Sequence, residues 1–350
     1  MNKFTVDNVN DNGAGSLRQA IVDANNTTGI DEIQFDRELD GQEIVLTSGE
    51  LEISDSVQIS DGDNNISING NNASRIFTVD DFDGTNQIEV VIDGLSLNGG
   101  SSSQGGGAIA NSENLTISNS NIVNNENTSL EPTDGGGAIR NSDTGSLNVY
   151  RSSITGNQST AFGGGITNFG ELNVKDSLIF DNEVTGGGGA GIDNRGSTAN
   201  ITGSFIIKNT NTANPAGGFG NGTPDSTTIV TDTVIAGNQA VNGAGFFINA
   251  GNVEIADSPI FNNQAQNNGG GTALAEGANL SIDNSLIIFN SAEVNGGGIA
   301  NLGGSVTSTG STVFGNEALG DAGGIFNQGD PLDLDSNFVI GNTPNNVVEV

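Results

Sequence analysis

Short apolar–polar alternations recur along this chain at a nearly regular interval. A glycine cluster followed by an apolar residue, and often by Asn, occurs nine times between residues 105 and 327. The copies are GGGAIAN at 105–111, GGGAIRN at 135–141, GGGITN at 163–168, GAGIDN at 189–194, GGFGN at 217–221, GAGFFIN at 243–249, GGGTAL at 269–274, GGGIAN at 296–301 and GGIFN at 323–327. Eight steps separate the apolar anchors Ile109 and Ile325, which gives a mean period of about 27 residues.

Two further series keep the same phase. One consists of a small polar residue, an apolar residue two positions later and an Asn five positions later, as in Ser120, Ile122 and Asn125. A unit with apolar residues two positions apart, such as Leu115 and Ile117, lies between the glycine cluster and this series. Alternation with a period of two indicates β-strands, so each period is expected to carry three strands.

Three short strands per period, with no helix between them, predict a parallel β-helix in which each strand pairs with its equivalent one coil along the axis. The expected fold class is therefore all-β, a parallel β-helix with about 27 residues per coil. We expect a right-handed coil, because parallel crossover connections are right-handed. At roughly 4.8 Å per coil, nine regular coils would extend about 40 Å.

The alternation also predicts which side chains lie inside the coil. Ile122, Ile154 and Ile179 would stack along the axis and bury one another. The Asn of the same series would lie at an inward turn, where its amide can bond to the loop backbone and to the equivalent Asn of the next coil. This predicted ladder comprises Asn125, Asn157, Asn182, Asn209, Asn238, Asn263, Asn290, Asn316 and Asn342.

We expect the chain to divide into four parts. Residues 1–34 would form an N-terminal cap, with a strand and a short helix, SLRQAIVDAN, that begins at an N-capping Ser16 and lays its apolar face over the first coil. Residues 35–104 would form irregular first coils, 105–343 nine regular coils, and 344–350 an acidic tail.

Composition narrows the chemistry. The chain contains no His and no Cys, which excludes histidine-dependent triads, thiolate nucleophiles and the usual zinc sites. Its net charge of −33 makes nucleic acid and anionic membranes poor partners. No stretch is apolar enough to predict a transmembrane segment, and the start of the chain, from Met1 to Asn12, does not resemble an export signal, so we expect neither in this chain.

The strongest candidate for function is a stripe of outward apolar residues. In the second series, the neighbours of the inward residue are also apolar in successive periods. The residues expected to bind a partner are Leu178, Phe180, Phe205, Ile207, Phe261, Ile288 and Phe314. Stacked on one face, they would form a contiguous hydrophobic surface of the kind that marks an interaction site. The alternative is that these residues only favour strands, or that a loop covers them.

Two segments resemble known families. The stretch FTVDNVNDNGAGSLRQAIVDANNTTGIDEIQFD at 4–36 resembles the N-terminal module named for its Ser-Leu-Arg-Glu-Ala core, with Gln19 in place of the Glu and Gly15 where a Cys often precedes the Ser. The repeats resemble those of polymorphic outer membrane proteins, which carry Gly-Gly-Ala-Ile and Phe-x-x-Asn, although Ile or Val replaces that Phe here. The resemblance implies an exported β-helix at the bacterial cell surface or outside the cell.

These observations predict a non-catalytic adhesion or structural rod that binds a protein or polysaccharide surface, or a second copy of itself, through the apolar stripe. The alternative is a polysaccharide lyase-like or carbohydrate-binding protein of the pectin lyase-like fold. A lyase would use Arg or Lys as its base, and Arg140, Asp193 and Arg195 fall on outward positions of one strand series. Solvated surface charge is the simpler interpretation of these three residues.

No cofactor is predicted, and calcium is the one ion that the sequence suggests. Asp80, Asp81 and Asp83 could gather an ion at an insertion between the early strands.

Overall fold

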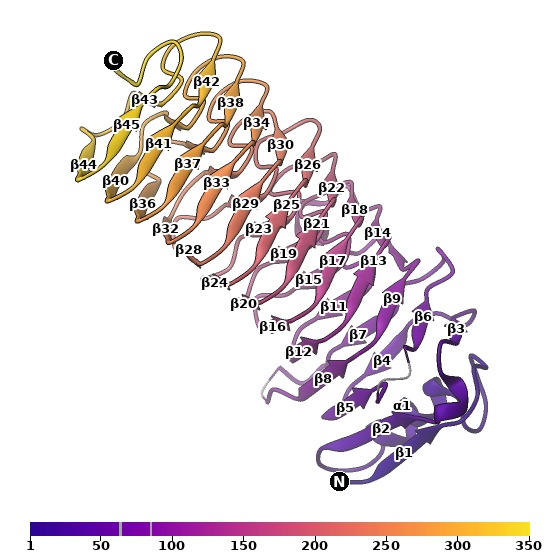
Figure 1. Ribbon diagram of the computed structural model, residues 1–350. Coiled ribbons are helices and arrows are strands. Elements are labelled where there is room, and N and C mark those ends of the chain that lie inside the picture. Colours follow the sequence, from indigo (N-terminus) through magenta and orange to yellow (C-terminus); the bar gives the residue numbers. More distant parts are fainter. Residues whose placement is uncertain (63–64, 85) are drawn as a thin grey trace.

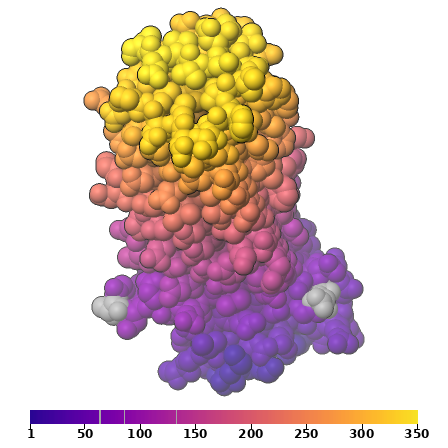
Figure 2. All heavy atoms as spheres, turned by 60° about the vertical axis from the view of Figure 1, so that its left-hand side comes forward, coloured from indigo at the N-terminus to yellow at the C-terminus, as the bar shows by residue number. Residues whose placement is uncertain are grey.

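A computed structural model describes residues 1–62, 65–84 and 86–350, and they form a parallel β-solenoid. Figure 1 shows the coils following one another along a single axis, with the N-terminus at one end and the C-terminus at the other. In the space-filling view the sequence colours succeed each other along the same rod (Figure 2). The predicted fold class is confirmed: every strand pair is parallel and joins equivalent residues of neighbouring coils.

Four sheets run along the axis. Sheet A contains β1 (Lys3–Val6), β2 (Asp31–Phe35), β5 (Val57–Ser60), β8 (Glu89–Asp93), β12 (Asn114–Ser118), β16 (Ser146–Tyr150), β20 (Glu171–Lys175), β24 (Thr198–Thr202), β28 (Thr227–Thr231), β32 (Asn252–Ala256), β36 (Asn279–Asp283), β40 (Ser305–Thr309) and β44 (Asp333–Asp335). Sheet B contains β3 (Glu43–Val45), β6 (Ser67–Asn69), β9 (Ser96–Asn98), β13 (Asn121–Val123), β17 (Ser153–Thr155), β21 (Leu178–Phe180), β25 (Phe205–Ile207), β29 (Val234–Ala236), β33 (Pro259–Phe261), β37 (Leu286–Ile288), β41 (Thr312–Phe314) and β45 (Phe338–Ile340).

Sheet C contains β4 (Leu51–Ile53), β7 (Phe77–Val79), β11 (Ile109–Asn111), β15 (Ile139–Asn141), β19 (Ile166–Asn168), β23 (Ile192–Asn194), β27 (Phe219–Asn221), β31 (Phe246–Ile248), β35 (Thr272–Leu274), β39 (Ile299–Asn301), β43 (Ile325–Asn327) and β46 (Val347–Glu349). Sheet D contains β10 (Ser101–Ser102), β14 (Glu126–Asn127), β18 (Gln158–Ser159), β22 (Glu183–Val184), β26 (Thr210–Asn211), β30 (Gln239–Ala240), β34 (Gln264–Ala265), β38 (Ser291–Ala292) and β42 (Glu317–Ala318). Sheets A, B and C are the three strand series that the sequence predicts. The sequence did not predict sheet D, because its strands are too short to show an alternation.

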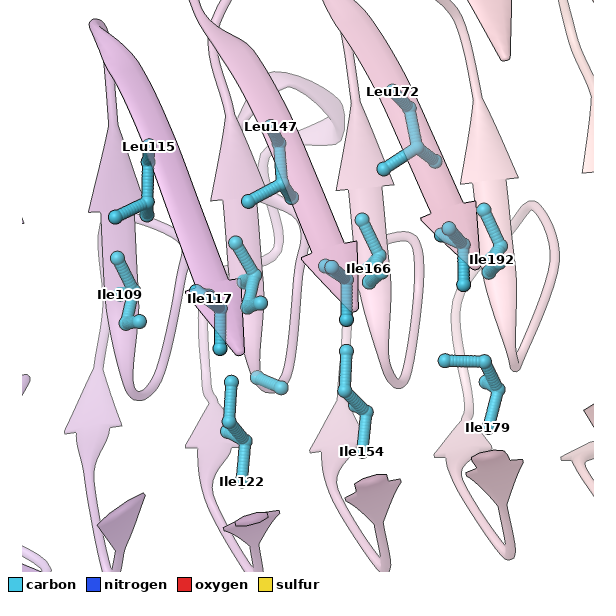
Figure 3. Close-up of a cluster of buried hydrophobic side chains, with 14 of the residues drawn as sticks. Ile109, Leu115, Ile117, Ile122, Leu147, Ile154, Ile166, Leu172, Ile179 and Ile192 are labelled. Atoms are coloured by element: carbon cyan, nitrogen blue, oxygen red, sulfur yellow. The ribbon is translucent and has the colours of Figure 1, made fainter. Parts of the chain in front are cut away.

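The core is built from identical or similar apolar residues stacked coil on coil. Ile154 pairs with Ile179, and Ile179 with Ile206, and all three side chains are fully buried. Figure 3 shows three of these rows, one of Leu115, Leu147 and Leu172, one of Ile122, Ile154 and Ile179, and one that includes Ile109, Ile166 and Ile192. Burying each such side chain contributes roughly 1.5–3 kcal/mol, which makes the rows the main source of stability.

A short helix covers the first coils. Helix α1 (Leu17–Asn25) begins at Ser16, whose hydroxyl accepts a hydrogen bond from the Gln19 amide, as the sequence predicts. Its buried face, Leu17, Ala20, Ile21 and Ala24, packs against β1, β2 and β4. The Arg18 guanidinium pairs with Asp11 at 2.7 Å and donates to the Gly49 and Glu50 carbonyl oxygens, which ties the preceding loop to the rod. Two 3₁₀ turns, Arg37–Leu39 and Pro132–Asp134, complete the helical segments among the described residues.

The last coil differs from the others in burial. Its inward residues Leu332, Leu334, Val339 and Val347 are only partly buried, although they pack against the core. Residues 344–350, expected as an acidic tail, include β46, which pairs with β43. Strand pairing therefore continues past residue 343, because Val347 and Val348 repeat the pattern of Ile325 and Phe326. Among the described residues, no helix is long and apolar enough to span a membrane.

Candidate interaction face

The outer face of sheet B carries two parallel columns of side chains that are apolar except for Thr312. In each three-residue strand the middle residue points inward and the first and third point outward, as the burial of β21 and β25 shows. The strand register aligns the first positions as Leu178, Phe205, Val234, Pro259, Leu286, Thr312 and Phe338. It aligns the third positions as Phe180, Ile207, Ala236, Phe261, Ile288, Phe314 and Ile340. We call these fourteen residues the outer stripe.

The outer stripe is open to solvent. Phe205 is 48% exposed, Leu286 45%, Phe314 41%, Phe338 70% and Ile340 60%. Most other members are half-buried because the neighbouring coils cover their flanks, and Ala236 is buried. All seven residues that the sequence singles out lie in the two columns, in consecutive register. The alternative of a covering loop is wrong for these exposed side chains.

Left-handed backbone conformations set the width of sheet B. In the coil of β29, Asp232 before the strand has φ 50° and Gly237 after it has φ 65°. In the next coil Asp257 and Asn262 take the same places, with φ 51° and 55°. Such residues turn the chain sharply, and Gly, Asn and Asp adopt this conformation at the lowest cost. Sheet B is thus a narrow flat strip between two sharp corners.

The predicted asparagine ladder lies along one edge of this strip and is confirmed. All nine Asn side chains are buried. The amide of Asn182 donates to the side-chain oxygen of Asn209 at 2.9 Å, and Asn209 donates in the same way to Asn238 at 3.1 Å. The same oxygen of Asn209 also accepts from the backbone amide of Asn182 at 3.0 Å. The ladder therefore satisfies backbone donors that the sharp corner would otherwise leave unpaired.

Two further ladders were not predicted. Along the other edge of sheet B, the backbone amide of each small polar residue donates to the side-chain oxygen of the next, for example Ser152 to the Ser177 hydroxyl at 3.2 Å. At the end of this ladder the Ser311 amide donates to the side-chain oxygen of Asn337. In sheet C, Asn111, Asn141, Asn168, Asn194 and Asn221 form a second buried asparagine ladder. The signals were in the sequence, as the Ser of the second series and the Asn that ends most of the glycine motifs.

The charge beside the outer stripe changes along the rod. At the corner between sheets A and B, the early coils carry Arg151 and Lys175 beside one exposed carboxylate, Asp176. The later coils carry exposed Asp232, Asp257 and Asp283 at this corner. No Lys or Arg occurs after Lys208 in the sequence, so the later coils contain no cation at all. The Lys208 ammonium lies 5.5 Å from the ring centroid of Phe180, which is a member of the outer stripe.

The lyase candidates are only partly brought together. Asp193 and Arg195 form an ion pair at 2.6 Å, and the Arg195 guanidinium lies over the ring of Phe162 at 3.7 Å from its centroid. Arg140 lies two coils away in the register and donates to the Thr133 carbonyl oxygen. Burial raises the pKa of Asp193, although Arg195 and the Gly189 amide oppose the shift.

The ion pair borders a small cavity of about 220 Å³ that Phe247 and Asn249 also line. A buried carboxylate and a guanidinium held in this way can position a polar ligand. Arg140, the third lyase candidate, belongs to another neighbourhood, over the ring of Phe169 at 5.4 Å from its centroid. The three residues therefore do not form one constellation.

Two of the three aspartates proposed to hold an ion lie beside a third carboxylate, Glu113, that the sequence did not predict. Carboxylate oxygens of Asp80, Asp81 and Glu113 lie within 4.8 Å of one another, whereas Asp83 is not in this group. Glu113 is buried, and burial raises its pKa although backbone amides of Ile88 and Asp81 donate to it. Three carboxylates at this spacing have the ligand chemistry that calcium prefers. Glu113 lies one coil further on, so only the fold could bring it to this loop.

A groove of about 490 Å³ runs over sheet D from β26 to β42 and is lined by both polar and apolar side chains, the latter being Ala240, Ala265, Ala292, Ala318 and Leu319. Gln239, Gln264, Ser291, Glu293 and Glu317 line it with amide, hydroxyl and carboxylate groups. No aromatic residue belongs to its lining.

Comparisons with known proteins give no family for this chain: neither a protein-family model nor a curated protein sequence matches it. The resemblances of residues 4–36 and of the repeats therefore stay predictions.

Proposed function

We propose that this protein is a non-catalytic structural or adhesion rod that associates with a partner through the outer stripe. The observation that carries the proposal is the continuity of outward, largely apolar side chains over seven coils, β21 to β45. Five of these side chains are exposed and most of the rest are half-buried. Scattered apolar residues are normal on a soluble protein, but a contiguous patch of more than a few hundred Å² usually marks an interaction surface. Covering such a patch removes apolar area from water at roughly 25 cal/mol per Å².

The rigidity of the solenoid suits this role. The outer stripe stands on a sheet whose two edges are fixed by buried ladders, so binding would cost little ordering of the backbone. The export and surface location of the protein are part of the proposal, and they rest on the resemblance of residues 4–36 and of the repeats to surface proteins.

The proposal is tested by removing the apolar side chains without changing the fold. In the Phe205→Ser/Phe261→Ser variant we expect a clear loss of retention on a phenyl-substituted matrix, with an unchanged circular dichroism spectrum. Ser153 already occupies the first column in β17, so Ser fits this backbone. The matched control is Leu130→Ser/Leu319→Ser, which removes two apolar residues that are 82% and 84% exposed outside sheet B. Equal losses in the two variants would contradict a special role for the stripe.

A carbohydrate-binding role is the second candidate, and the groove over sheet D favours it. Its amides and hydroxyls offer donors and acceptors along the axis, as an extended glycan requires. Here a Gln239→Ala/Gln264→Ala variant should lose retention on polysaccharide gels while stripe variants keep it. The lyase form of this candidate predicts release of unsaturated sugars, abolished by Arg195→Ala with the fold intact, and also by Arg140→Ala. Absence of both retention and turnover would remove it.

A further inference from the structure

We propose that the partner of the outer stripe is a cationic amphipathic helix that lies along the rod axis. This inference rests on the proposed function, because it names the occupant of the same face. The outer stripe would contact the apolar face of such a helix, and the carboxylates at the corner between sheets A and B would pair with its cations.

A row of carboxylates borders the first column of the stripe. Asp232 and Asp257 lie in register in neighbouring coils, and Asp283 lies in the next coil one position earlier in the chain. Asp335, two coils further on, is in register with Asp283. All four side chains are exposed. Because no Lys or Arg follows Lys208, the later coils offer them no cation from this chain. Exposed carboxylates in a row attract a partner that presents cations in a row.

The spacing of the coils fits a helix laid along the axis. Neighbouring coils are roughly 4.8 Å apart, and an α-helix presents one residue of a given face per turn of about 5.4 Å. Seven coils cover about 29 Å, which a helix of roughly 20 residues spans. A helix with an apolar face and a Lys or Arg flank would place about five apolar side chains and about five cations along the seven coils.

Charge disfavours a second copy of this chain as the occupant. If two copies met face to face with antiparallel axes and their full stripes in register, β29 would face β37 of the other copy. Asp232 would then lie opposite the second copy's Asp283 at the same corner. Each copy also carries a net charge of −33, so the approach is repulsive. Like charges placed opposite one another across an interface suppress the wrong partner.

The probe is a synthetic amphipathic helix of Leu and Lys, compared with a Leu/Glu helix and with a Ser/Lys peptide of equal charge. We expect the Leu/Lys helix to bind the full-length protein at least tenfold more tightly than either comparison peptide, as measured by fluorescence anisotropy. Binding should weaken as salt is raised, because the ion pairs are exposed. Equal binding of the Leu/Lys and Ser/Lys peptides would show attraction to net charge alone and would overturn the proposal.

Two variants locate the site. Asp232→Asn/Asp257→Asn/Asp283→Asn should weaken binding of the Leu/Lys helix by about tenfold, a typical sum for three exposed pairs. Asn already occupies the corner of Asp232 and Asp257 in other coils, at Asn119 and Asn284, so the backbone is preserved. The matched control changes Asp225→Asn, Glu254→Gln and Glu276→Gln, which are exposed and lie on sheet A or in the turns before it. An equal effect of the two triple variants would overturn the proposed position of the helix.

The two proposals fail in different ways. If Phe205→Ser/Phe261→Ser leaves binding of the Leu/Lys helix unchanged, the stripe is not the interface and the proposed function fails with the inference. If that variant abolishes binding but the Leu/Glu helix binds as well as the Leu/Lys helix, the stripe stands and the cationic partner is wrong. A dimer in sedimentation equilibrium that Phe205→Ser/Phe261→Ser dissociates would make a second copy the occupant and overturn the inference.

Discussion

The outer faces of sheets B and C follow the same alternation but differ in solvent exposure. In sheet B the outward residues Phe205 and Leu286 are about half exposed. In sheet C the outward residues Thr167, Asp193, Ala273 and Ala300 are buried. In the regular coils a glycine-rich segment precedes the sheet C strand and folds back over it, as at Gly163, whose added Cβ would lie 2.3 Å from the Thr167 hydroxyl. Alternation decides what lies inside the coil, whereas the connecting loop decides whether the outer side is a surface.

The same comparison extends to the asparagine ladders. The ladder beside sheet B is unbroken over nine coils. The ladder of sheet C is interrupted in register by Ile248 and Leu274. An interruption is tolerated where the turn can satisfy its own backbone, as at Asn168, which bonds to the Gly170 carbonyl oxygen within its own coil. Beside sheet B each ladder oxygen also accepts from the backbone amide of the previous coil's Asn, so each deletion leaves several groups unpaired.

The largest effect is expected from breaking the ladder beside sheet B. Asn238→Leu should lower the free energy of unfolding by about 4 kcal/mol. The change removes the hydrogen-bond partner of the Asn209 backbone and side-chain amides and of the Ile206 carbonyl oxygen, and each unpaired buried group costs roughly 1–3 kcal/mol. The matched change in sheet C, Asn168→Leu, should cost about 1–2 kcal/mol, because Leu274 already occupies an equivalent position. Urea denaturation followed by circular dichroism measures both. Equal losses of unfolding free energy would mean that the two ladders contribute equally to stability.

The second prediction concerns the loop that covers sheet C. Gly136 has φ 89°, and an added Cβ would lie 2.2 Å from the Ile139 carbonyl oxygen. Gly136→Ala should therefore cost about 3 kcal/mol, because backbone must shift to admit the methyl group. At the sheet B corner, Gly237 has φ 65° but its nearest neighbour is the flexible Lys208 side chain at 3.6 Å. Gly237→Ala should cost only about 1 kcal/mol, from the left-handed backbone alone. Thermal unfolding of the two variants separates these contributions.

A smaller and opposite effect is expected from Thr272 in sheet C. Its hydroxyl is buried and lacks a hydrogen-bond partner among the described residues. Its neighbours in the same inward row are Phe246 and Ile299. Thr272→Val keeps the shape and removes the unpaired hydroxyl, so stability should rise by about 1 kcal/mol. A loss of stability in the urea titration would show that the hydroxyl has a partner after all.

The smallest effect is a pH dependence at Asp193. Burial raises its folded pKa above the ordinary 3.8, so the folded protein holds this proton more firmly than the unfolded chain. The charged form therefore destabilises the fold above the raised pKa, and this cost disappears as the pH falls to 3.8. Relative to Asp193→Asn, the wild type should gain stability over that interval. A parallel pH dependence in the two proteins would mean that the Arg195 pair offsets the burial.

The cap provides a contrast of the opposite sign. Burial alone would raise the pKa of Asp11, but hydrogen bonds from Arg18, Thr47 and Ser48 lower it to about 2. Asp11 therefore contributes stability that is complete above 3.8 and lost as the pH falls toward about 2. Hydrogen exchange of the α1 amides should show this loss in the wild type and not in Asp11→Asn. A cap that loosens equally in both proteins would assign the acid sensitivity to other groups.

Much of the fold follows from particular residues of the repeat. The stacking of Ile179 on Ile206 could be predicted, because a nearly regular repeat period and a strict alternation leave one arrangement that pairs every strand. The nine ladder asparagines are predicted for the same reason, and so is the position of the outer stripe. Sheet D, the hydroxyl ladder and Glu113 beside Asp80 could not be predicted, because they depend on very short strands or on contacts between coils.

The sequence by itself determined the coil, its inward rows and the side on which apolar residues accumulate, because these are properties of period and alternation. Only the tertiary structure decided which outer face stays open. Burial of Thr167 and Asp193 depends on how the glycine segments fold back, and exposure of Phe205 depends on the absence of such a segment over sheet B in the described chain. The path of a glycine loop cannot be predicted from an apolar pattern, because glycine has no side chain that would show which side is buried.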